Sequence, residues 1–213
     1  MKSLVVYGAG GHAKVVAEIA RLSQWEVVGF IDGVNLHRKS QSFYGSQILG
    51  GDEILEDLIP SGVKHAIVAF GNNRLRVATA RKLVDRGFSL ISVIHPSVIY
   101  SKDLKLGDGT IVAAGVVVGP STKIGEHVII NTHATLDHEC SVSDGAHIGP
   151  GAVVSGGVLV GECAWIGAGA VISDHKEIGV DSIVGAGAVV VKDVPDAVVA
   201  VGVPAKVIRK INL

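Results

Sequence analysis

The sequence predicts two structural parts: a small α/β domain over residues 1–92 and a parallel β-helix of hexapeptide repeats over residues 93–213. Three observations predict this division. Aliphatic residues recur every six positions through the second part, and strand-like runs alternate with helical patterns in the first. The chain also has 28 glycines and 48% hydrophobic but only 4% aromatic residues. Such a composition is typical of a core of small and branched aliphatic side chains joined by tight turns.

The first element is expected to be a buried strand at residues 4–7, followed by the glycine turn GAGGHA and a helix. The helix carries apolar residues along one side, which are Val15, Val16, Ile19, Ala20 and Leu22. A second strand, EVVGFID, ends at Asp32. These elements begin a β-α-β pattern, which predicts a parallel sheet with helices on its faces.

The rest of the first part continues the alternation. We expect a strand at HAIVAFG ending at Gly71, a helix over residues 74–86 stopped by Gly87, and a last strand at SLISVI. Residues 33–62 are the least regular segment, in which LGGDEILEDLI predicts a turn and a short helix.

The glycine turn lies between a strand and a helix, where backbone N–H groups and the helix dipole are able to receive a phosphate. Gly8, Gly10 and Gly11 allow a close approach of the backbone, and Asp32 lies 24 residues after Gly8, near the distance of an acidic ribose contact. A tight turn that needs glycine for geometry alone is the alternative. Because the sheet ends near Ile94, a nucleotide-sugar site is favoured over a site for NAD.

The second part has one dominant pattern, a period of six. Fifteen successive positions hold Leu, Ile or Val, and these are Leu106, Val112, Val118, Ile124, Ile130, Leu136, Val142, Ile148, Val154, Val160, Ile166, Ile172, Ile178, Val184 and Val190. The residue four positions after the aliphatic is usually small. This period fits neither an α-helix nor an alternating strand. It fits three short strands per triangular coil, with the aliphatic side chain inside. An ordinary valine-rich β-sandwich is the alternative. The final segment AKVIRKI is expected to cap the open end of the prism.

Charge, targeting signals and cysteines exclude several classes of protein. The net charge is -1, so no nucleic-acid surface or contact with an acidic membrane is expected. The N-terminus is neither a signal peptide nor a membrane span. Cys140 and Cys163 show no metal-ligand spacing, and Cys140 falls at a small inward position. We therefore expect a cytoplasmic protein without a structural metal or membrane insertion.

The order of short motifs along the chain resembles one family. With GAGGHAKVV, GFID, GNNRLR, HPSVIYS, LDHEC and VGVPAKVI, the sequence is similar to the bacterial nucleotide-sugar acetyltransferases with hexapeptide repeats. These include N-acetyltransferases of 4-amino-4,6-dideoxy sugars, such as those of bacillosamine and perosamine synthesis, and sialic acid O-acetyltransferases. The resemblance covers nearly the whole chain.

The resemblance implies a homotrimer of left-handed β-helices that binds acetyl-CoA between neighbouring subunits and acetylates a nucleotide-linked amino sugar. The product would enter glycan, O-antigen or capsule synthesis. By similarity His138 is the general base, Glu139 is its acidic partner, and His147 lies near the acetyl group. Histidine suits proton removal from an attacking amine because its unperturbed pKa lies near neutrality. A surface histidine is the alternative for His138, and packing beside Trp165, one coil away, is the alternative for His147.

The resemblance also implies the substrate and cofactor contacts. The family positions for the nucleotide sugar map onto Gly10, Gly11, His12, Asp32 and Asn72, and we add Gly8 and Gly71. Units such as IGAGAV leave a low surface for the pantetheine arm of CoA. The expected CoA contacts are His147, Gly149, Gly167, Ala168, Gly185, Ala186, Lys192 and Pro204, with Lys206 and Arg209 as further candidates for its phosphates. Many relatives have a second acidic residue after the strand-ending Asp, whereas this chain has Gly33, so UDP and GDP both stay open.

Three other functions use the same residues. A sialic acid O-acetyltransferase would differ only in the acceptor. A zinc-dependent hydratase of the carbonic anhydrase type would bridge subunits with three histidines, for which His133, His138 and His147 are available. The N-terminal nucleotide-binding pattern argues against this function, because a hydratase would not need a nucleotide-binding domain. A nucleotide-binding scaffold without catalysis would not need the His138–Glu139 pair. The sequence favours N-acetyl transfer by direct attack of the sugar amine on the thioester.

Overall fold

The computed structural model describes residues 2–212 and divides into two compact units. The first unit ends at Pro96 and the second begins at Ser97, shortly after the boundary expected at residues 92 and 93.

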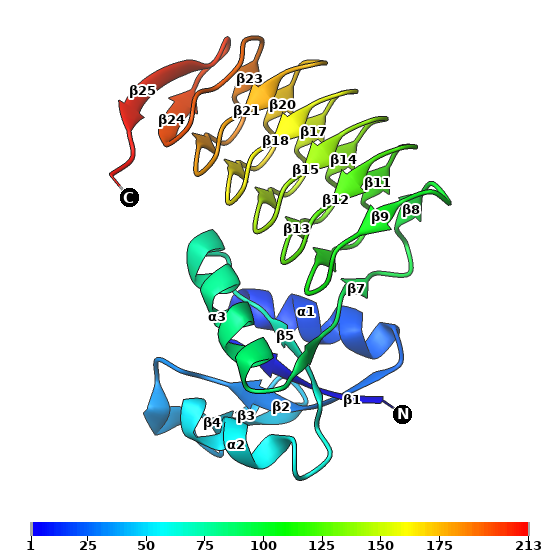
Figure 1. Ribbon diagram of the computed structural model, residues 1–213, viewed down its shortest axis with the longest axis vertical. Helices are drawn as coiled ribbons and strands as arrows, with labels where there is room; N and C mark the ends of the chain where they lie inside the picture. Colours follow the sequence, from blue (N-terminus) through cyan, green and yellow to red (C-terminus); the bar gives the residue numbers. More distant parts are fainter. Residues whose placement is uncertain (1, 213) are drawn as a thin grey trace. The chain divides into compact units, whose positions relative to one another are not determined.

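The first unit is an α/β unit, as the alternating pattern predicts (Figure 1). Its elements are β1 (Lys2–Tyr7), α1 (Gly11–Leu22), β2 (Trp25–Ile31), η1 (Leu36–Arg38), β3 (Ser42–Phe43), β4 (Ser46–Gly50), η2 (Asp52–Ile54), α2 (Leu55–Leu58), β5 (His65–Val68), α3 (Asn73–Asp85), β6 (Ser89–Leu90) and β7 (Val93–Ile94). Strands β1 to β6 form one sheet in the order β3-β4-β2-β1-β5-β6, in which only the β3–β4 hairpin is antiparallel. The parallel order brings the carboxyl ends of β1, β2 and β5 to one edge, where ligands bind in open α/β sheets.

Helix α1 differs in one respect from the sequence prediction. Its buried face is formed by Ala13, Val16, Ala17, Ile19 and Ala20. Val15 and Leu22, which were expected on the same side, are 40% and 48% exposed. Val16, Ala17 and Ala20 follow Ala13 by three, four and seven positions, so these four residues lie on one face of the helix. Val15 and Leu22 lie outside that face.

Helix α3 begins and ends where the sequence signals indicate. The Asn72 side chain accepts a hydrogen bond from the Leu75 backbone N–H at 2.9 Å, which satisfies one free donor of the first turn. Gly87, with a φ of 88°, follows the end of the helix.

The second unit is a β-helix with three faces (Figure 1). The strands that the second unit contributes to sheet I are β10 (Ile111–Val112), β13 (Ile129–Ile130), β16 (His147–Ile148), β19 (Trp165–Ile166), β22 (Ile183–Val184), β24 (Val198–Val201) and β25 (Lys206–Lys210). Sheet II holds β8 (Ile99–Tyr100), β11 (Val117–Val118), β14 (Thr135–Leu136), β17 (Val153–Val154), β20 (Val171–Ile172) and β23 (Val189–Val190). Sheet III holds β9 (Lys105–Leu106), β12 (Lys123–Ile124), β15 (Ser141–Val142), β18 (Leu159–Val160) and β21 (Glu177–Ile178).

Each coil passes through sheets I, II and III in turn, and parallel partners from β8 to β23 are 18 residues apart, for example Val117 and Thr135. The second residue of each short strand points inward, and the hexapeptide aliphatics occupy these positions. From Val112 to Val190 every one of them is buried. The small residues four positions later, such as Ala134, Cys140 and Ala152, are buried as well. The period of six is therefore the period of the core, which confirms the β-helix prediction.

Three corners join the sheets. Corner I/II contains residues 113–115, 131–133, 149–151, 167–169 and 185–187; corner II/III contains residues 119–121, 137–139, 155–157 and 173–175; corner III/I contains residues 107–109, 125–127, 143–145, 161–163 and 179–181. The third residue of many corners is in the left-handed region, including non-glycine residues such as His133, Glu139 and His175. The sharp turn at each corner requires this conformation.

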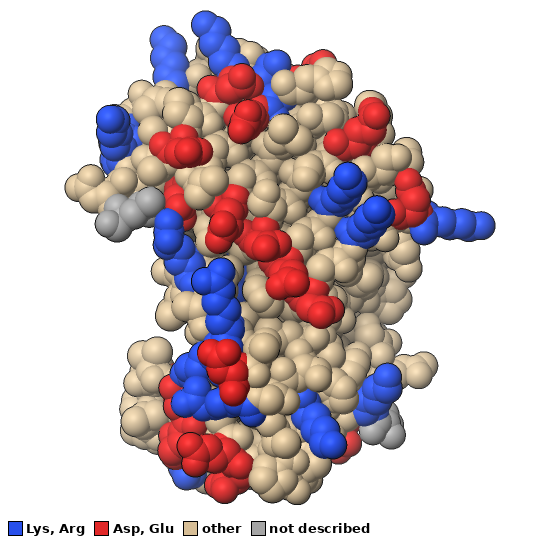
Figure 2. Space-filling view, in the orientation of Figure 1, with Lys and Arg blue, Asp and Glu red and all other residues tan. Residues whose placement is uncertain are grey.

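Corner III/I carries a row of acidic side chains one coil apart, which are Asp108, Glu126, Asp144 and Glu162. Figure 2 shows Asp and Glu gathered in a diagonal row over these turns. Asp144 is partly structural, since its Oδ1 accepts a hydrogen bond from the Glu126 backbone N–H at 2.8 Å.

The C-terminal segment AKVIRKI differs from the expected cap. Residues Lys206–Lys210 form β25, which pairs antiparallel with β24 at the end of sheet I, and all five residues are exposed. The segment therefore satisfies the backbone groups of the last edge of sheet I and does not close the interior of the prism. Within residues 2–212 no helix is long and apolar enough to cross a bilayer.

Candidate active site

A cavity of about 680 Å³ lies at the carboxyl ends of β1, β2 and β5 in the first unit. All seven residues predicted to hold the nucleotide sugar line it, and these are Gly8, Gly10, Gly11, His12, Asp32, Gly71 and Asn72. A Cβ atom added at Gly10, Gly11 or Gly71 would meet no atom within 4 Å. The backbone at these positions therefore faces open space, into which a ligand could come close.

Helix α1 starts at this cavity without a side-chain cap and without an acidic residue in its first turn. Its first N–H groups and the positive end of its dipole are therefore available to an anion. Gly8, with a φ of 129°, could not carry a side chain, because a Cβ atom would lie 2.8 Å from the carbonyl oxygen of Ala69, the first residue after β5.

Asp32 is held by its own loop. Its carboxylate accepts hydrogen bonds from the backbone N–H groups of Val34 and Asn35 at 3.2 and 2.9 Å, and from Arg38 Nη1 at 2.8 Å. Burial alone would raise the pKa of Asp32, but these hydrogen bonds outweigh it and lower the pKa. The carboxylate thus stays charged and fixes the loop that forms one side of the cavity.

A second polar network joins Tyr7, Asp52 and Lys82. The Tyr7 hydroxyl donates to Asp52 Oδ1 at 2.6 Å, and Lys82 Nζ forms an ion pair with the other oxygen of Asp52. Burial, followed by the hydrogen bond to Asp52, raises the pKa of Tyr7 above its ordinary value. A Cβ atom at Gly33 would lie 2.6 Å from the Tyr7 hydroxyl. Tyr7 therefore fills the space next to Gly33.

His12 lies at the start of α1 and lines the cavity. Its Nε2 is buried and has no hydrogen-bond partner among the described residues. Burial and the nearby charge of Arg76 lower the pKa of His12 to about 4, so the ring is neutral at pH 7. A neutral imidazole adds no charge to an anion site and is able to form one hydrogen bond with a ligand.

In the second unit, His138 projects from corner II/III. Its Nδ1 lies 3.0 Å from Glu139 Oε2, and about half of its side chain is exposed (51%). The carboxylate fixes Nδ1 as the protonated nitrogen, which leaves Nε2 as the atom able to accept a proton.

His147 lies in β16 on the outer side of sheet I and is 8% exposed. Its ring stacks on Trp165 of the next coil, with centroids 5.8 Å apart and planes at 10°. Its Nε2 lies 3.2 Å from Asn131 Nδ2. The packing against Trp165 expected as the alternative is present, and it holds the ring beside corner I/II.

Corner I/II carries most of the residues predicted to bind CoA. Gly149, Gly167 and Gly185 lie one coil apart, and Ala168 and Ala186 follow the last two of them. A Cβ atom at the third corner residues Gly151, Gly169 and Gly187 would meet nothing within 4 Å. This stripe of small residues forms a low track beside His147.

The remaining candidates are distributed differently. His133 is an exposed residue of corner I/II, whereas Cys140 is buried and burial raises its pKa, as expected of a core thiol. No group of three His, Cys, Asp or Glu suited to a metal ion occurs within residues 2–212 of one chain.

Comparisons with known proteins identify relatives over the whole chain. Residues 3–83 match the family model of the PglD N-terminal domain. The structure superimposes on a single-residue variant of the perosamine N-acetyltransferase from Caulobacter crescentus, solved with CoA and GDP-perosamine, at a TM-score of 0.94, with 42% identity over 98% of this chain and 97% of that one. It superimposes on the acetyltransferase domain of PglB from Neisseria gonorrhoeae, solved with acetyl coenzyme A, at a TM-score of 0.90, with 38% identity over 97% of this chain and 99% of that one.

The chain belongs to the nucleotide-sugar acetyltransferases with hexapeptide repeats. A curated relative, the UDP-N-acetylbacillosamine N-acetyltransferase of Bacillus subtilis (strain 168), is 37% identical over 116 residues. That match spans 54% of this chain and about half (52%) of the relative.

Several cavity residues of this acetyltransferase were not found from the sequence. Tyr7, Arg38 and Lys82 line the cavity, and Asp52 binds two of them. Tyr7 directly precedes the glycine turn, so its place at the end of β1 was a usable signal. Arg38 and Asp52 lie between residues 33 and 62, a segment without a clear hydrophobic period, so the sequence did not indicate their role. Lys82 lies in α3, far along the chain from Tyr7 and Asp52, so its place in the network was not visible either.

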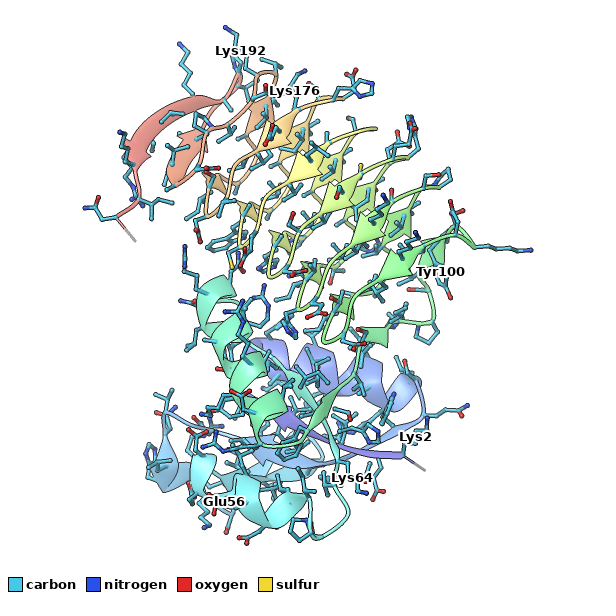
Figure 3. The ribbon with its side chains drawn as sticks, in the orientation of Figure 1. Lys2, Glu56, Lys64, Tyr100, Lys176 and Lys192 are labelled. Carbon is cyan, nitrogen blue, oxygen red and sulfur yellow. The ribbon has the colours of Figure 1, made fainter. Side chains whose placement is uncertain are left out.

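Two expected CoA contacts of the acetyltransferase lie apart from each other. The Ala205 N–H donates to the Val189 carbonyl at 2.7 Å, which places Pro204 beside β23, near the end of the small-residue stripe. Lys192 instead follows β23 on the side of corner II/III, and it projects from the end of the second unit (Figure 3). Lys192 and the stripe therefore lie at opposite edges of sheet II.

Proposed function

We propose that the chain transfers the acetyl group of acetyl-CoA to the 4-amino group of a UDP- or GDP-linked 4-amino-4,6-dideoxy sugar. The observation that carries the proposal is the 42% identity, over 98% of this chain and 97% of the relative, to a perosamine N-acetyltransferase solved with CoA and GDP-perosamine. The cavity beside the uncapped start of α1 supports a nucleotide diphosphate site, and the His138–Glu139 pair supports a base.

In the proposed step, the amine nitrogen attacks the thioester carbonyl carbon, and His138 Nε2 takes the proton that the nitrogen loses. Glu139 holds Nδ1–H and stabilises the imidazolium. The tetrahedral intermediate then expels the CoA thiolate, which receives a proton from the imidazolium. The products are an acetamido sugar nucleotide and free CoA. No covalent acetyl-enzyme is needed, and the buried Cys140 is not a nucleophile.

The proposed partners include two further copies of the chain. His138 lies at corner II/III, whereas His147 and the small-residue stripe lie at corner I/II or beside it. Six residues at about 3.3 Å per residue make each side of the prism roughly 15–20 Å wide, so these groups do not meet within one chain. A neighbouring chain would have to supply the second half of the site.

The outer side of sheet II supports such an assembly. Its outward residues form a column of β-branched side chains, which are Ile99, Val117, Thr135, Val153, Val171 and Val189. The corresponding column of sheet III is Lys105, Lys123, Ser141, Leu159 and Glu177. An apolar face bounded by the two candidate corners is suited to a closed homotrimer, in which corner II/III of one copy meets corner I/II of the next.

The test measures free thiol released from acetyl-CoA with a panel of UDP- and GDP-linked 4-amino sugars, together with free and CMP-linked sialic acid. Turnover with one amino sugar is the expected result and would also fix the nucleotide. Turnover with sialic acid alone would overturn N-acetylation in favour of the O-acetyltransferase alternative.

The role of His138 is tested with a matched pair of variants. We expect His138→Asn to lower kcat by about 10²- to 10⁴-fold, the usual size of general base catalysis. His175 lies at the same corner two coils further along and serves as the control. His175→Asn is expected to keep most of the activity, and equal losses in both variants would contradict the assignment.

A further inference from the structure

The loop after β2 carries an arginine, Arg38, at the edge of the cavity. Arg38 ends η1 and lines the cavity. Its Nη1 donates to the Ala9 carbonyl oxygen at 3.0 Å and to Asp32 Oδ2 at 2.8 Å. Arg38 therefore bridges the glycine turn and the Asp32 loop, which are the two sides of the expected nucleotide site.

The guanidinium is held in place from several directions. Asp32 binds one edge, and the ring of Phe43 lies 5.3 Å from the guanidinium carbon, a cation–π contact. The side chain is 25% exposed, so most of its length is buried. A preorganised guanidinium loses little rotamer entropy when it binds a ligand.

Most donors of Arg38 are unused. A guanidinium has five N–H groups, and Nη1 supplies both bonds that Arg38 makes to residues 2–212. The donors on Nη2 and Nε are left over. Asp32, by contrast, is almost fully occupied by its loop and is 6% exposed. In the Arg38–Asp32 ion pair, Arg38 therefore has N–H groups available to a ligand.

The surroundings of Arg38 favour an anion. Ala9, whose carbonyl it binds, directly precedes Gly10 and Gly11 at the start of α1, where there is open space and the helix dipole is positive. We infer that Arg38 binds the diphosphate of the nucleotide sugar together with the first N–H groups of α1. This inference rests on the proposed function and adds a binding residue to it.

The test compares ligands that differ only in the diphosphate. Binding of UDP and GDP, and of uridine and guanosine, is measured by calorimetry or by competition. We expect Arg38→Gln to weaken binding of the tighter nucleoside diphosphate by about 10- to 100-fold, since charged bonds to phosphate are strong. Binding of the matching nucleoside is expected to change by less than about twofold.

The adjacent Lys39 provides a matched control. Its Nζ lies 3.7 Å from Glu53 Oε1, its side chain is 55% exposed, and it does not line the cavity. Lys39→Gln removes the same charge from nearly the same place and is expected to leave the affinity for the diphosphate within about twofold. Arg38→Lys, which keeps the charge but not the planar donors, is expected to fall between the two.

Each outcome distinguishes this inference from the proposed function. Equal weakening of nucleoside and nucleoside diphosphate in Arg38→Gln would show that Arg38 only holds the loop, and would overturn the inference. Unchanged affinity in both Arg38 variants would also overturn it. If Arg38→Gln does not fold, Arg38→Lys carries the same comparison. A wild-type protein that binds neither UDP nor GDP would overturn the proposed function itself.

Discussion

The imidazole of His138 lies over Gly156, one coil further along the β-helix. A Cβ atom at residue 156 would lie 2.5 Å from Cε1 and 2.7 Å from Nε2 of His138. A side chain at residue 156 therefore requires the His138 ring to move from the position in which it binds Glu139.

We therefore expect Gly156→Ala to displace the proposed base. A shift of about 1 Å at a catalytic group typically lowers the rate by up to about 10²-fold. The kcat for acetyl transfer should fall by about 10- to 100-fold, and the KM values of both substrates should stay nearly constant. The measurement is steady-state thiol release, with Ser155→Ala as the neighbouring control. A Gly156→Ala variant with the kcat of the wild type would contradict this account of the site.

Gly33 and Tyr7 are expected to be coupled. A methyl group at residue 33 would meet the Tyr7 hydroxyl at 2.6 Å but the ring carbon behind it only at 3.5 Å. Gly33→Ala should cost about 1–3 kcal/mol of unfolding free energy, and less when Tyr7→Phe has removed the hydroxyl. Urea unfolding of the two single variants and the double variant measures the coupling. Gly71→Ala, where space is open, is the control. Strictly additive effects would refute the steric explanation.

His12 makes stability depend on pH in a defined direction. Its pKa is about 4 in the folded chain, against 6.5 for an unperturbed histidine, so the unfolded chain binds this proton more tightly. The folded state is therefore unaffected above pH 6.5 and loses stability as the pH falls from 6.5 toward 4. The loss from this group is roughly 2 kcal/mol at pH 5. Urea unfolding at pH 7 and pH 5 should show a smaller difference for His12→Gln than for the wild type. An identical difference in both proteins would be evidence against the lowered pKa.

The proposed trimer is tested on two faces of the same β-helix. Val153 on sheet II and Leu159 on sheet III are both outward and partly exposed, at 39% and 48%. We expect Val153→Lys to dissociate the assembly, because an ammonium group would be buried in an apolar interface. Leu159→Lys should not change it. Sedimentation equilibrium measures the mass, and thiol release should fall only where the trimer is lost. A trimer in both variants would place the interface elsewhere.

The β-helix could be predicted closely because its information is local and repeated. The position of Ile130 or Val154 in the six-residue period is enough to place it inside the prism. The 18-residue coil also placed His147 beside Trp165. The prediction for helix α1 was less accurate, because Val15 and Leu22 are apolar but lie outside the buried face of the helix.

The cavity could be predicted only in part. Its glycine turn and Asp32 follow strands and were visible, but the partners of Asp32 were not. Arg38 lies in an irregular segment, and the Tyr7–Asp52–Lys82 network joins β1, η2 and α3, which are separated by 75 positions from Tyr7 to Lys82. Long-range polar networks of this kind leave no period in the sequence, so they emerge only when the fold brings them together.

The strict 18-residue coil makes the β-helix a molecular ruler with divisions of about 4.8 Å. Removing or adding one whole coil would change the length by one division and leave every face with its own chemistry. Removing six residues would instead move every later strand to a neighbouring sheet. The valine column of sheet II would then be continued by side chains that now lie on another sheet. Length along the axis is thus adjustable in units, whereas the order of the faces around it is not.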